Sequence, residues 1–567
     1  MRRLAASLMA GLVCAAVASA QGSDERSRAR EASARRDWPT ALQLFERLIE
    51  RHPQDVDLLI EAARVQGFAD RNAEAARLYR QALAAAPGRR ADIVPSLAWQ
   101  SLWSGEAAQA LALFDERLAA LSGPARAEWL DGLAQARQAL GDQAGALQAY
   151  READALSPGQ KRLQQRLALS WLWNGHEARA TELLQELARR HPQDREIAWS
   201  LANTRNFAGA HRAALAGFRA WPHPGAPGER ADLARAWRWA GYEERALPLL
   251  AEPIDAESAW LRDYRVRREV APYVYATAER SEDRDALVLR AAVLGGGWHP
   301  RAGATAELQG RTLTLRDAHD GMDGRQLLAT LRWRVGEAEA PGGTWWPSVA
   351  LRVSQIEGWQ TWAPTVRLTG IPRDHWRVDL EATRELVEAP RALASRVQVD
   401  VASIGVEHRP PAPWQLSAAA AIARFDDGTQ RLRLSTRAAW RVVSRPRVWA
   451  GAEGLWLDRL QGHPATDRGY WNPLRYHEAR AFVALEQEWR PFELQGRLAY
   501  GSSRELDGSG RWSRGSPHMW ELGLGWDLRP ALRLRLAAGG SGADLGLGGG
   551  GTGYWRRYLN LSANLWF

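Results

Sequence analysis

Small and large apolar residues in the first half of the chain recur with a period of about 34 residues, a spacing typical of helical repeats. One position of the repeat holds a small residue, at Ala41, Ala75, Ala110, Ala146, Ala180, Ala214 and Ala246. A large apolar residue follows four positions later, at Phe45, Tyr79, Phe114, Tyr150, Leu184, Phe218 and Leu250. This pattern predicts a solenoid of paired helices over residues 21–262, with about seven repeats.

Tryptophan is frequent in the first helix of the predicted pairs, at Trp99, Trp103, Trp171, Trp173, Trp237 and Trp239. We interpret these rings as core between helices. A stripe that stacks on a ligand is the alternative, because indole rings can serve either role.

The pattern changes to strict alternation over residues 263–567. Trp520, Leu522 and Leu524 alternate with Glu521 and Gly523, and comparable segments of 10 to 15 residues are separated by Gly, Pro and Asp turns. A soluble antiparallel sheet also alternates. The segment length favours a membrane barrel, as does the final strand, which ends on the apolar Phe567.

Aromatic residues near the predicted strand ends suit the interface girdles of such a barrel. These residues are Trp345, Trp346, Trp376, Trp489, Trp512, Tyr554 and Trp555. We therefore expect them at the two membrane surfaces.

Sixteen strands can be counted, the first at residues 268–280 and the last at 553–567. The short links Arg445-Pro446, Arg490-Pro491 and Arg529-Pro530 fall on one parity, and long links such as 459–474 and 542–552 fall on the other. Porin-like barrels have short periplasmic turns and longer outer loops. The predicted fold is thus an N-terminal α-helical solenoid followed by a 16-stranded antiparallel transmembrane β-barrel.

The first 20 residues predict a secretory signal peptide, with Arg2 and Arg3 before an apolar stretch and Ala18-Ser19-Ala20 at the cleavage site. Cys14, the single cysteine of the sequence, lies within it. The formal charge is +9, yet Arg is spread among Asp and Glu along the 567 residues. This even spread argues against nucleic acid as a partner.

A barrel of this size encloses an aqueous lumen, and the alternation assigns polar side chains to its inner face. The pore-lining candidates are Arg332, Arg334, Arg377, Asp379, Glu381, Arg431, Arg433, Arg437, Glu486, Glu488, Glu493, Arg497, Glu521, Asp527, Arg533 and Arg535. Such rows suit a hydrated sugar chain, because charged groups bond hydroxyls and aromatic faces stack on sugar rings.

The combination of features resembles a known family. The helical repeat resembles the tetratricopeptide repeat (TPR), and TPR plus barrel is similar to the exopolysaccharide export porins of the poly-N-acetylglucosamine type and, more distantly, the cellulose type. The element Gly469-Tyr470-Trp471-Asn472-Pro473 is similar to one in a late barrel loop of that family. This suggests Tyr470 and Trp471 as stacking residues at the pore exit.

The resemblance implies an outer-membrane porin that exports an exopolysaccharide for a biofilm matrix, with the TPR solenoid in the periplasm. The implied partners are a polysaccharide chain, outer-membrane lipid, periplasmic proteins that bind the solenoid, and the barrel-assembly machinery that reads the strand ending at Phe567. The chain is shorter than such exporters usually are, and the many lumen Arg residues do not form the acidic lining expected for a cationic glycan.

Two other classes of protein have to be compared with the sequence. An outer-membrane hydrolase would need a Ser and His constellation, and the barrel histidines fall mostly in turns or at strand ends without a recognisable partner. The sequence also lacks a phosphate loop, a zinc spacing and a nucleotide fingerprint, so we expect no catalysis, cofactor or metal. The remaining alternative is a TPR-anchored receptor or assembly scaffold that transports no polymer.

Overall fold

The computed structural model describes residues 24–221, 227–462, 468–541 and 550–567. The predicted signal peptide lies outside these residues. The chain forms two compact units, Met1–Asn174 and Gly175–Phe567, which are described separately.

The first unit consists of helices. After a helix over residues 24–34 come α2 (Trp38–Arg51), α3 (Val56–Phe68), α4 (Asn72–Ala85), α5 (Arg90–Trp103), α6 (Ala107–Leu118), α7 (Gly123–Ala139), α8 (Gln143–Leu156) and α9 (Lys161–Trp173). The second unit begins with α10 (Glu177–Arg190), α11 (Arg195–Phe207), α12 (His211–Arg219), α13 (Pro227–Trp239), α14 (Glu243–Leu249), α15 (Ala256–Leu261), a π-helical turn (Arg262–Val266) and α16 (Arg267–Val270). None of the helices in the described ranges is long and apolar enough to cross a bilayer.

The predicted repeat positions form the core between the helices. All seven small residues and all seven large apolar residues are at most 2 % exposed. Each small residue lets the partner helix approach closely, and the residue one turn later fills the space between the helices, as Phe114 does between Trp99 and Trp129 with ring centroids 5.2 and 5.3 Å away. The helical repeat prediction is confirmed.

The tryptophans of the first helices divide between core and surface. Trp237 is buried, with 8 % of its surface exposed, as the core interpretation expects. Trp103 is 55 % exposed, so that interpretation is wrong for this residue. Trp99 already packs on Phe114, and Trp103 lies one turn further, at the last position of α5, where it packs on Trp99 with ring centroids 5.5 Å apart.

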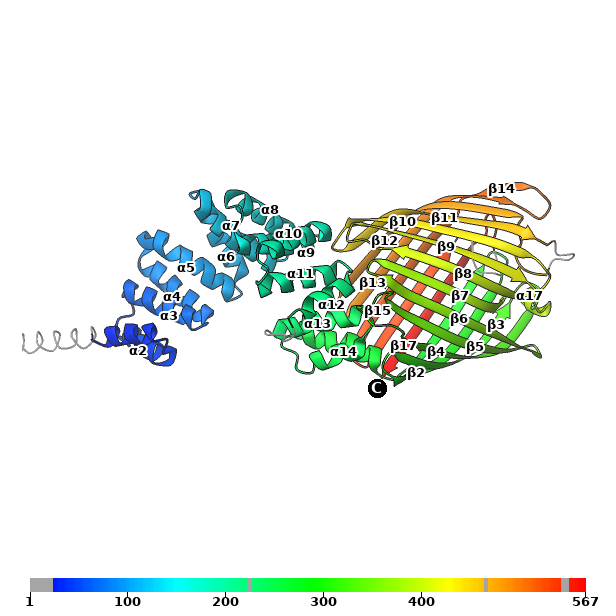
Figure 1. Cartoon of the computed structure of the whole chain (residues 1–567), viewed down its shortest axis with the longest axis horizontal. Coiled ribbons are helices and arrows are strands. Elements are labelled where there is room, and N and C mark those ends of the chain that lie inside the picture. Colours follow the sequence, from blue (N-terminus) through cyan, green and yellow to red (C-terminus); the bar gives the residue numbers. More distant parts are fainter. Residues whose placement is uncertain (1–23, 222–226, 463–467, 542–549) are drawn as a thin grey trace, which may run out of the picture. The chain divides into compact units, whose positions relative to one another are not determined.

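The rest of the second unit is a ring of strands (Figure 1). They are β1 (Tyr273–Asp283), β2 (Val288–Arg301), β3 (Ala304–Arg316), β4 (Gly321–Trp333), β5 (Thr344–Ile356), β6 (Trp359–Arg373), β7 (Trp376–Leu386), β8 (Gln398–His408), β9 (Trp414–Phe425), β10 (Gln430–Val443), β11 (Arg447–Gln461), β12 (Arg475–Trp489), β13 (Phe492–Leu506), β14 (Trp512–Gly515), β15 (His518–Arg529), β16 (Leu532–Ser541) and β17 (Arg556–Trp566). A short helix, α17 (Pro390–Ala394), lies between β7 and β8.

The ring is closed and antiparallel. Apart from the short β14, each strand pairs with the strands before and after it along the chain, and β1 pairs with β17, for example Tyr273 with Trp566. β14 and β15 both pair with β13, so they are two segments of one barrel strand and the barrel has sixteen strands. The predicted fold class, a helical solenoid followed by a 16-stranded antiparallel barrel, is confirmed.

The join between helices and barrel differs from the prediction. A strand was expected over 268–280, but α16 continues to Val270 and β1 begins at Tyr273. The contacts of Arg268 with the barrel account for helical structure up to Val270. From its position on α16, its guanidinium donates to the backbone carbonyls of Arg529 and Pro530, at 2.8 and 2.7 Å, and to the carboxylate of Asp527.

The outer face of the barrel carries exposed apolar side chains, as a lipid-facing surface requires. Among the expected girdle residues, Trp376, Trp489 and Trp512 are 42 to 54 % exposed. Two others are not at the outer surface. The ring of Trp346 lies 5.7 Å from the inward-facing Arg332, and Tyr554 is 4 % exposed because its hydroxyl donates to Asp283 at 2.7 Å.

Candidate functional site: the barrel lumen and its outer end

Strand parity separates the lipid-facing residues from those of the lumen. On β10, for example, Leu434, Trp440 and Val442 are exposed outer residues, whereas Arg433 and Arg437 have the opposite parity. Cross-strand partners share a face, so the register extends this division around the ring, as where Arg437 pairs with Glu453.

The pore-lining candidates on strands have the inward parity. They are Arg332 on β4, Arg377, Asp379 and Glu381 on β7, Arg431, Arg433 and Arg437 on β10, Glu486 and Glu488 on β12, Glu493 and Arg497 on β13, Glu521 and Asp527 on β15, and Arg533 and Arg535 on β16. Arg334 lies just past the end of β4. Their role in transport stays a prediction.

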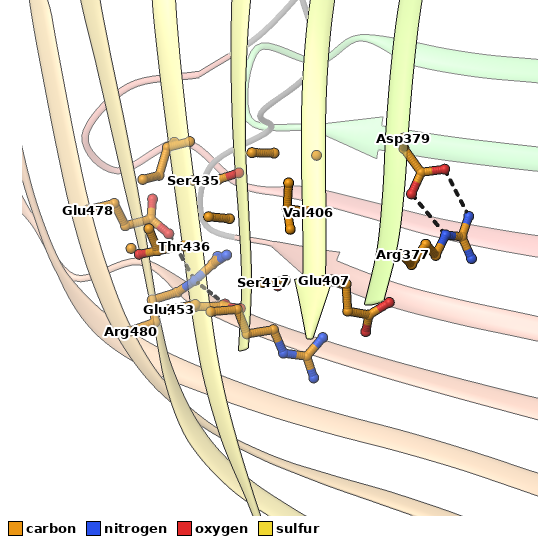
Figure 2. A pocket seen from close by; sticks show the side chains of 16 residues that line it. Arg377, Asp379, Val406, Glu407, Ser417, Ser435, Thr436, Glu453, Glu478 and Arg480 are labelled. Atoms are coloured by element: carbon orange, nitrogen blue, oxygen red, sulfur yellow. Dashed lines mark hydrogen bonds and ion pairs between the residues drawn. The ribbon is translucent and has the colours of Figure 1, made fainter. Parts of the chain in front are cut away.

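Ion pairs join many of the inward side chains. Arg377 Nε donates to Asp379 at 2.8 Å, and Arg480 Nε donates to Glu453 at 2.9 Å, both on the wall of a cavity of about 410 Å³ (Figure 2). Arg497 also donates to Glu453, and Arg533 donates to Glu493. The wall therefore presents neighbouring positive and negative groups rather than a field of one sign.

Two further cavities lie against the inner wall, of about 660 and 580 Å³, and both are lined by Arg311, Glu388 and Arg556. The sequence interpretation missed these residues, and it also missed Glu453 and Arg480. Strand parity could have identified the strand residues among them. Glu388 lies in a link between strands, where no periodic pattern marks it.

Glu388 belongs to a segment that folds into the barrel, here called the lumen loop (residues 387–397). Glu388 accepts from Arg311 Nη1 of β3 at 2.6 Å, although the loop leaves the wall at β7. Leu393 of α17 packs with the inward-facing Leu313, Leu315 and Ile356. The lumen loop thus lies within the barrel, at the end where α17 is drawn in Figure 1.

The Gly469-Tyr470-Trp471-Asn472-Pro473 element packs against the lumen loop. The Tyr470 ring stacks on Phe425, with centroids 4.5 Å apart and planes at 7°, and shares an apolar cluster with Val387, Ala392 and Val397. A Cβ on Gly469 would lie 2.8 Å from the Ala392 backbone nitrogen, so this close approach requires glycine.

Both expected exit-loop residues are engaged within the protein. Tyr470 is 8 % exposed, and burial, together with its hydrogen bond to Asp427, raises its pKa to about 12. Trp471 Nε1 donates to Glu505 at 2.8 Å. The structure therefore gives these rings a packing role that was not expected, since the Phe425 ring covers one face of Tyr470.

Three of the lumen candidates are held by other parts of the chain. Arg431 is 4 % exposed and bonds the carbonyl of Trp471 and Asn472 Oδ1. Asp527, 8 % exposed, is paired with Arg268 of α16. Arg334 bonds the carbonyl of Gly241 and the carboxylate of Glu244, so it anchors α14.

Helices α10 to α16 contact the barrel at the end opposite the lumen loop. The carboxylate of Asp374, in the β6 to β7 turn, accepts the backbone N–H groups of Arg212 and Ala213 in the first turn of α12, each at 3.1 Å. This is a helix cap supplied by the barrel. Arg441 bonds Glu177 of α10 at 2.8 Å. Polar contacts of this kind fix these helices to the short turns.

The inner wall offers hydrogen-bond donors and acceptors. Arg donates through five N–H groups and a carboxylate accepts through two oxygens, so a paired group keeps capacity for a passing hydroxyl. Within the ranges that the structure describes, no group of three or more His, Cys, Asp or Glu side chains is placed to hold a metal ion. The arrangement is one of many weak polar contacts spread along the inner wall of the barrel.

The structure defines a helical-repeat region followed by a closed β-barrel, and a family model matches part of the barrel. Residues 357–493 match the family model "PgaA membrane beta barrel domain". This match confirms the resemblance to the polysaccharide export porins for the barrel. No curated protein matches the chain.

Solved structures with a similar fold have low sequence identity. A "bacterial polysaccharide outer membrane secretin" is 12% identical, with a TM-score of 0.43, and the match covers 53% of this chain and 99% of that one. A tetratricopeptide repeat protein from Parabacteroides merdae is 16% identical, with a TM-score of 0.38 and coverage of 42% and 97%. The pilus biogenesis factor PilW is 18% identical, with a TM-score of 0.32 and coverage of 37% and 96%.

Proposed function

We propose that the protein is an outer-membrane porin that exports a polysaccharide, of the poly-N-acetylglucosamine or cellulose kind, for a biofilm matrix. The match of residues 357–493 to the PgaA-type barrel domain carries this proposal. The inner wall supports it, because paired polar groups such as Arg377 and Asp379 can exchange hydrogen bonds with a sliding sugar chain without holding it at one point. The protein acts in transport and not in catalysis.

The test is polysaccharide release in a strain that lacks the gene and carries a plasmid copy. Ala419 and Ala421 of β9 have the inward parity, and Ala418 and Ala420 the outward parity. Ala419→Trp with Ala421→Trp narrows the lumen and should reduce release, whereas Ala418→Trp with Ala420→Trp adds the same rings on the lipid side and should not. Normal release from the deletion strain would exclude the export function.

The orientation is part of the proposal. The helices contact the end with the short turns, so we place the TPR solenoid in the periplasm, where it guides the polymer or recruits periplasmic proteins. A cysteine at Gln461, an exposed residue where β11 runs into the β11 to β12 loop, should react with an impermeant reagent on intact cells. A cysteine at Arg490, which contacts Glu257 of α15, should not. Reaction at both positions would contradict this topology.

We also propose that the last strand is the signal for barrel assembly. Phe567 is 72 % exposed on the lipid side, and its N–H donates to the carbonyl of Pro272 at 3.0 Å. Deletion of Phe567 should lower the amount of heat-resistant barrel in outer-membrane fractions. Phe567→Tyr keeps an aromatic end and serves as the control.

A receptor or assembly scaffold is the second candidate, and the lumen loop favours it. A barrel that stays filled by residues 387–397 would act as an anchor for the TPR helices. Single-channel recording distinguishes the two functions. A full-length barrel that passes current in some state supports export, and one that never conducts supports the scaffold.

A further inference from the structure

Two tyrosines lie side by side on the inner wall at the helical end of the barrel, where α10 to α16 contact it. Tyr273 and Tyr275 of β1 have the inward parity, because Val274 between them is 41 % exposed on the lipid side. Their rings lie nearly parallel, with centroids 6.3 Å apart and planes at 25°. β1 begins at Tyr273, shortly after α16 ends at Val270, so both rings lie at the mouth of the lumen.

The neighbouring strands hold both rings flat against the wall. Gly297 and Gly295 of β2 are their cross-strand partners, and a Cβ on either glycine would lie 2.5 Å from the ring that covers it. The two hydroxyls donate to the carboxylate oxygens of Glu307 on β3, at 2.6 and 2.8 Å. Each ring therefore turns one face to the wall and the other face to the lumen.

Hydrogen-bonding groups flank the two rings. The Glu307 carboxylate can accept further hydrogen bonds beyond those from the two tyrosines. Gln309 Oε1 lies 2.9 Å from the Tyr275 hydroxyl, and Asn564 of β17 is the cross-strand partner of Tyr275 on the other side. A ring face beside carboxylate and amide groups suits a pyranose ring, because the C–H face of the sugar stacks while its hydroxyls form hydrogen bonds.

The helices bring an entering polymer close to these rings, because they bridge the mouth of the barrel. Ala338, in the link between β4 and β5, shares an apolar cluster with Leu261 of α15 and Val266 of the π-helical turn. The adjacent Arg265 pairs with Glu488, near the end of β12, at 2.8 Å. These two contact points lie on opposite sides of the ring of strands, so the helices cross the opening between them. β1 lies near the middle of one of the two arcs on either side of this bridge, and a polymer that enters through that arc passes over the two tyrosines.

We propose that Tyr273 and Tyr275, positioned by Glu307, form an entry subsite that takes two neighbouring pyranose rings of the polymer as it passes into the lumen. This inference rests on the proposed export function. It places sugar stacking at the helical end, whereas the sequence suggested Tyr470 and Trp471 at the outer end, where both side chains have partners within the protein. Contact with a ring face is weak, so the subsite can align the chain and still release it.

Hydroxyl-radical footprinting of the full-length wild-type protein tests the site directly, with chitotriose and cellotriose as probes. Either trisaccharide should lower the oxidation of Tyr273 and Tyr275. The control is Tyr558, which covers Gly539 in the same way on the wall of the 660 Å³ cavity. Its cross-strand partner Ser281 lies six residues beyond Tyr275 on β1, about 20 Å away, so its oxidation should not change. Protection of all three tyrosines alike, or of none, would overturn the subsite.

Two double variants separate stacking from packing. Tyr273→Leu with Tyr275→Leu still covers the glycines but presents no aromatic face, so the Kd of chitotriose, measured by calorimetry, should rise about tenfold. Tyr273→Phe with Tyr275→Phe loses only the bonds to Glu307 and should stay within about threefold of the wild type. An unchanged Kd in the Leu variant would overturn the subsite, and if that variant does not insert, the wild-type footprint decides.

The export function is judged by a separate measurement, polysaccharide release in the deletion strain. Release that is lost in this strain, together with tyrosines that no trisaccharide protects, would reject the subsite alone. Normal release would reject the export function on which the subsite rests.

Discussion

The segments that lie at the two ends of the barrel are held there by different kinds of contact. At the end with the short turns, α12 and α16 are held by ion pairs and by bonds to backbone carbonyls, such as those from Arg268 to Arg529 and Pro530. At the other end, the lumen loop is held by apolar packing around Leu393, Tyr470 and Phe425. One contact set is directional and the other depends on the area buried.

The two kinds of contact have different consequences for the proposed transport function. Directional bonds between α12 and Asp374 fix a helix in one position, which suits a platform that must stay aligned with the pore. Apolar packing holds the lumen loop with a free energy set by the buried area. Polar contacts add to this packing: Glu388 accepts from Arg311 at 2.6 Å, and Arg468 donates to the backbone carbonyl of Ser395.

The strongest expected effect comes from removing the lumen loop. Replacement of residues 388–396 by a short Gly-Ser turn should raise the single-channel conductance several-fold, because the segment lies inside the barrel wall. Replacement of the 507–511 loop by the same turn is the control, since that loop is exposed. Equal conductance in both variants would mean that the lumen loop does not limit the pore.

At the helical end, Arg268→Ala should lower the free energy of unfolding by about 3 kcal/mol, because it leaves the buried charge on Asp527 with only the longer contact to Arg533, at 3.8 Å. Arg490→Gln removes an exposed pair with Glu257 at the same end and should cost less than about 1 kcal/mol. Urea unfolding in detergent, followed by tryptophan fluorescence, measures both. Similar losses would show that the Arg268 contact is not buried in solution.

Periodic patterns predicted the helical repeats and the barrel because both folds require apolar and polar residues at fixed short spacings along the chain. Ala41 and Phe45 occupy fixed positions of one helix face, and Arg433 and Arg437 fixed positions of one strand face, so burial follows from sequence alone. The lumen loop escaped prediction because its apolar residues, such as Val387 and Leu393, have no period. Their burial depends on the inner faces of β2, β3 and β5, which only the closed ring brings together.

The burial of Tyr470 was missed for the same reason, because it also depends on contacts that form only in the folded barrel. A tyrosine beside Trp471 in a late loop gives no indication of whether it faces solvent or the Phe425 ring. Strand parity likewise assigned Arg431 to the lumen but could not show that the chain itself would occupy its hydrogen bonds. Residues at strand ends were therefore predicted less well than those in the middle of the wall.

Arg431 and Arg377 have the same inward parity but different surroundings, so their variants compare a buried arginine near the lumen loop with a half-exposed arginine at the opposite end. Arg431 is 4 % exposed, and its guanidinium lies 4.5 Å from the centre of the Phe425 ring, so Arg431→Gln should cost about 2 kcal/mol and speed proteolysis of the 468–474 segment. Arg377→Gln breaks a half-exposed pair and should cost less than about 1 kcal/mol. Equal proteolysis rates would contradict the packing role assigned to Arg431.

The effect of pH at the helical end is small near neutrality. Burial lowers the pKa of His211, at the start of α12, to about 4; the nearby Asp374 carboxylate opposes this shift and His375 adds to it. The folded form therefore binds a proton less readily than the unfolded chain, whose histidine has a pKa near 6.5. The contribution of His211 to stability is complete above about pH 6.5 and is lost as the pH falls toward 4, by about 1 kcal/mol at pH 6 and about 2 kcal/mol at pH 5. Hydrogen exchange of His211–Arg219, corrected for intrinsic rates, should thus show weaker protection at pH 5 than at pH 7.5. His211→Gln should remove most of this difference, while the lumen loop, which is held mainly by apolar packing, should show none. A pH dependence that survives His211→Gln would assign it to His375 instead, whose pKa burial also lowers.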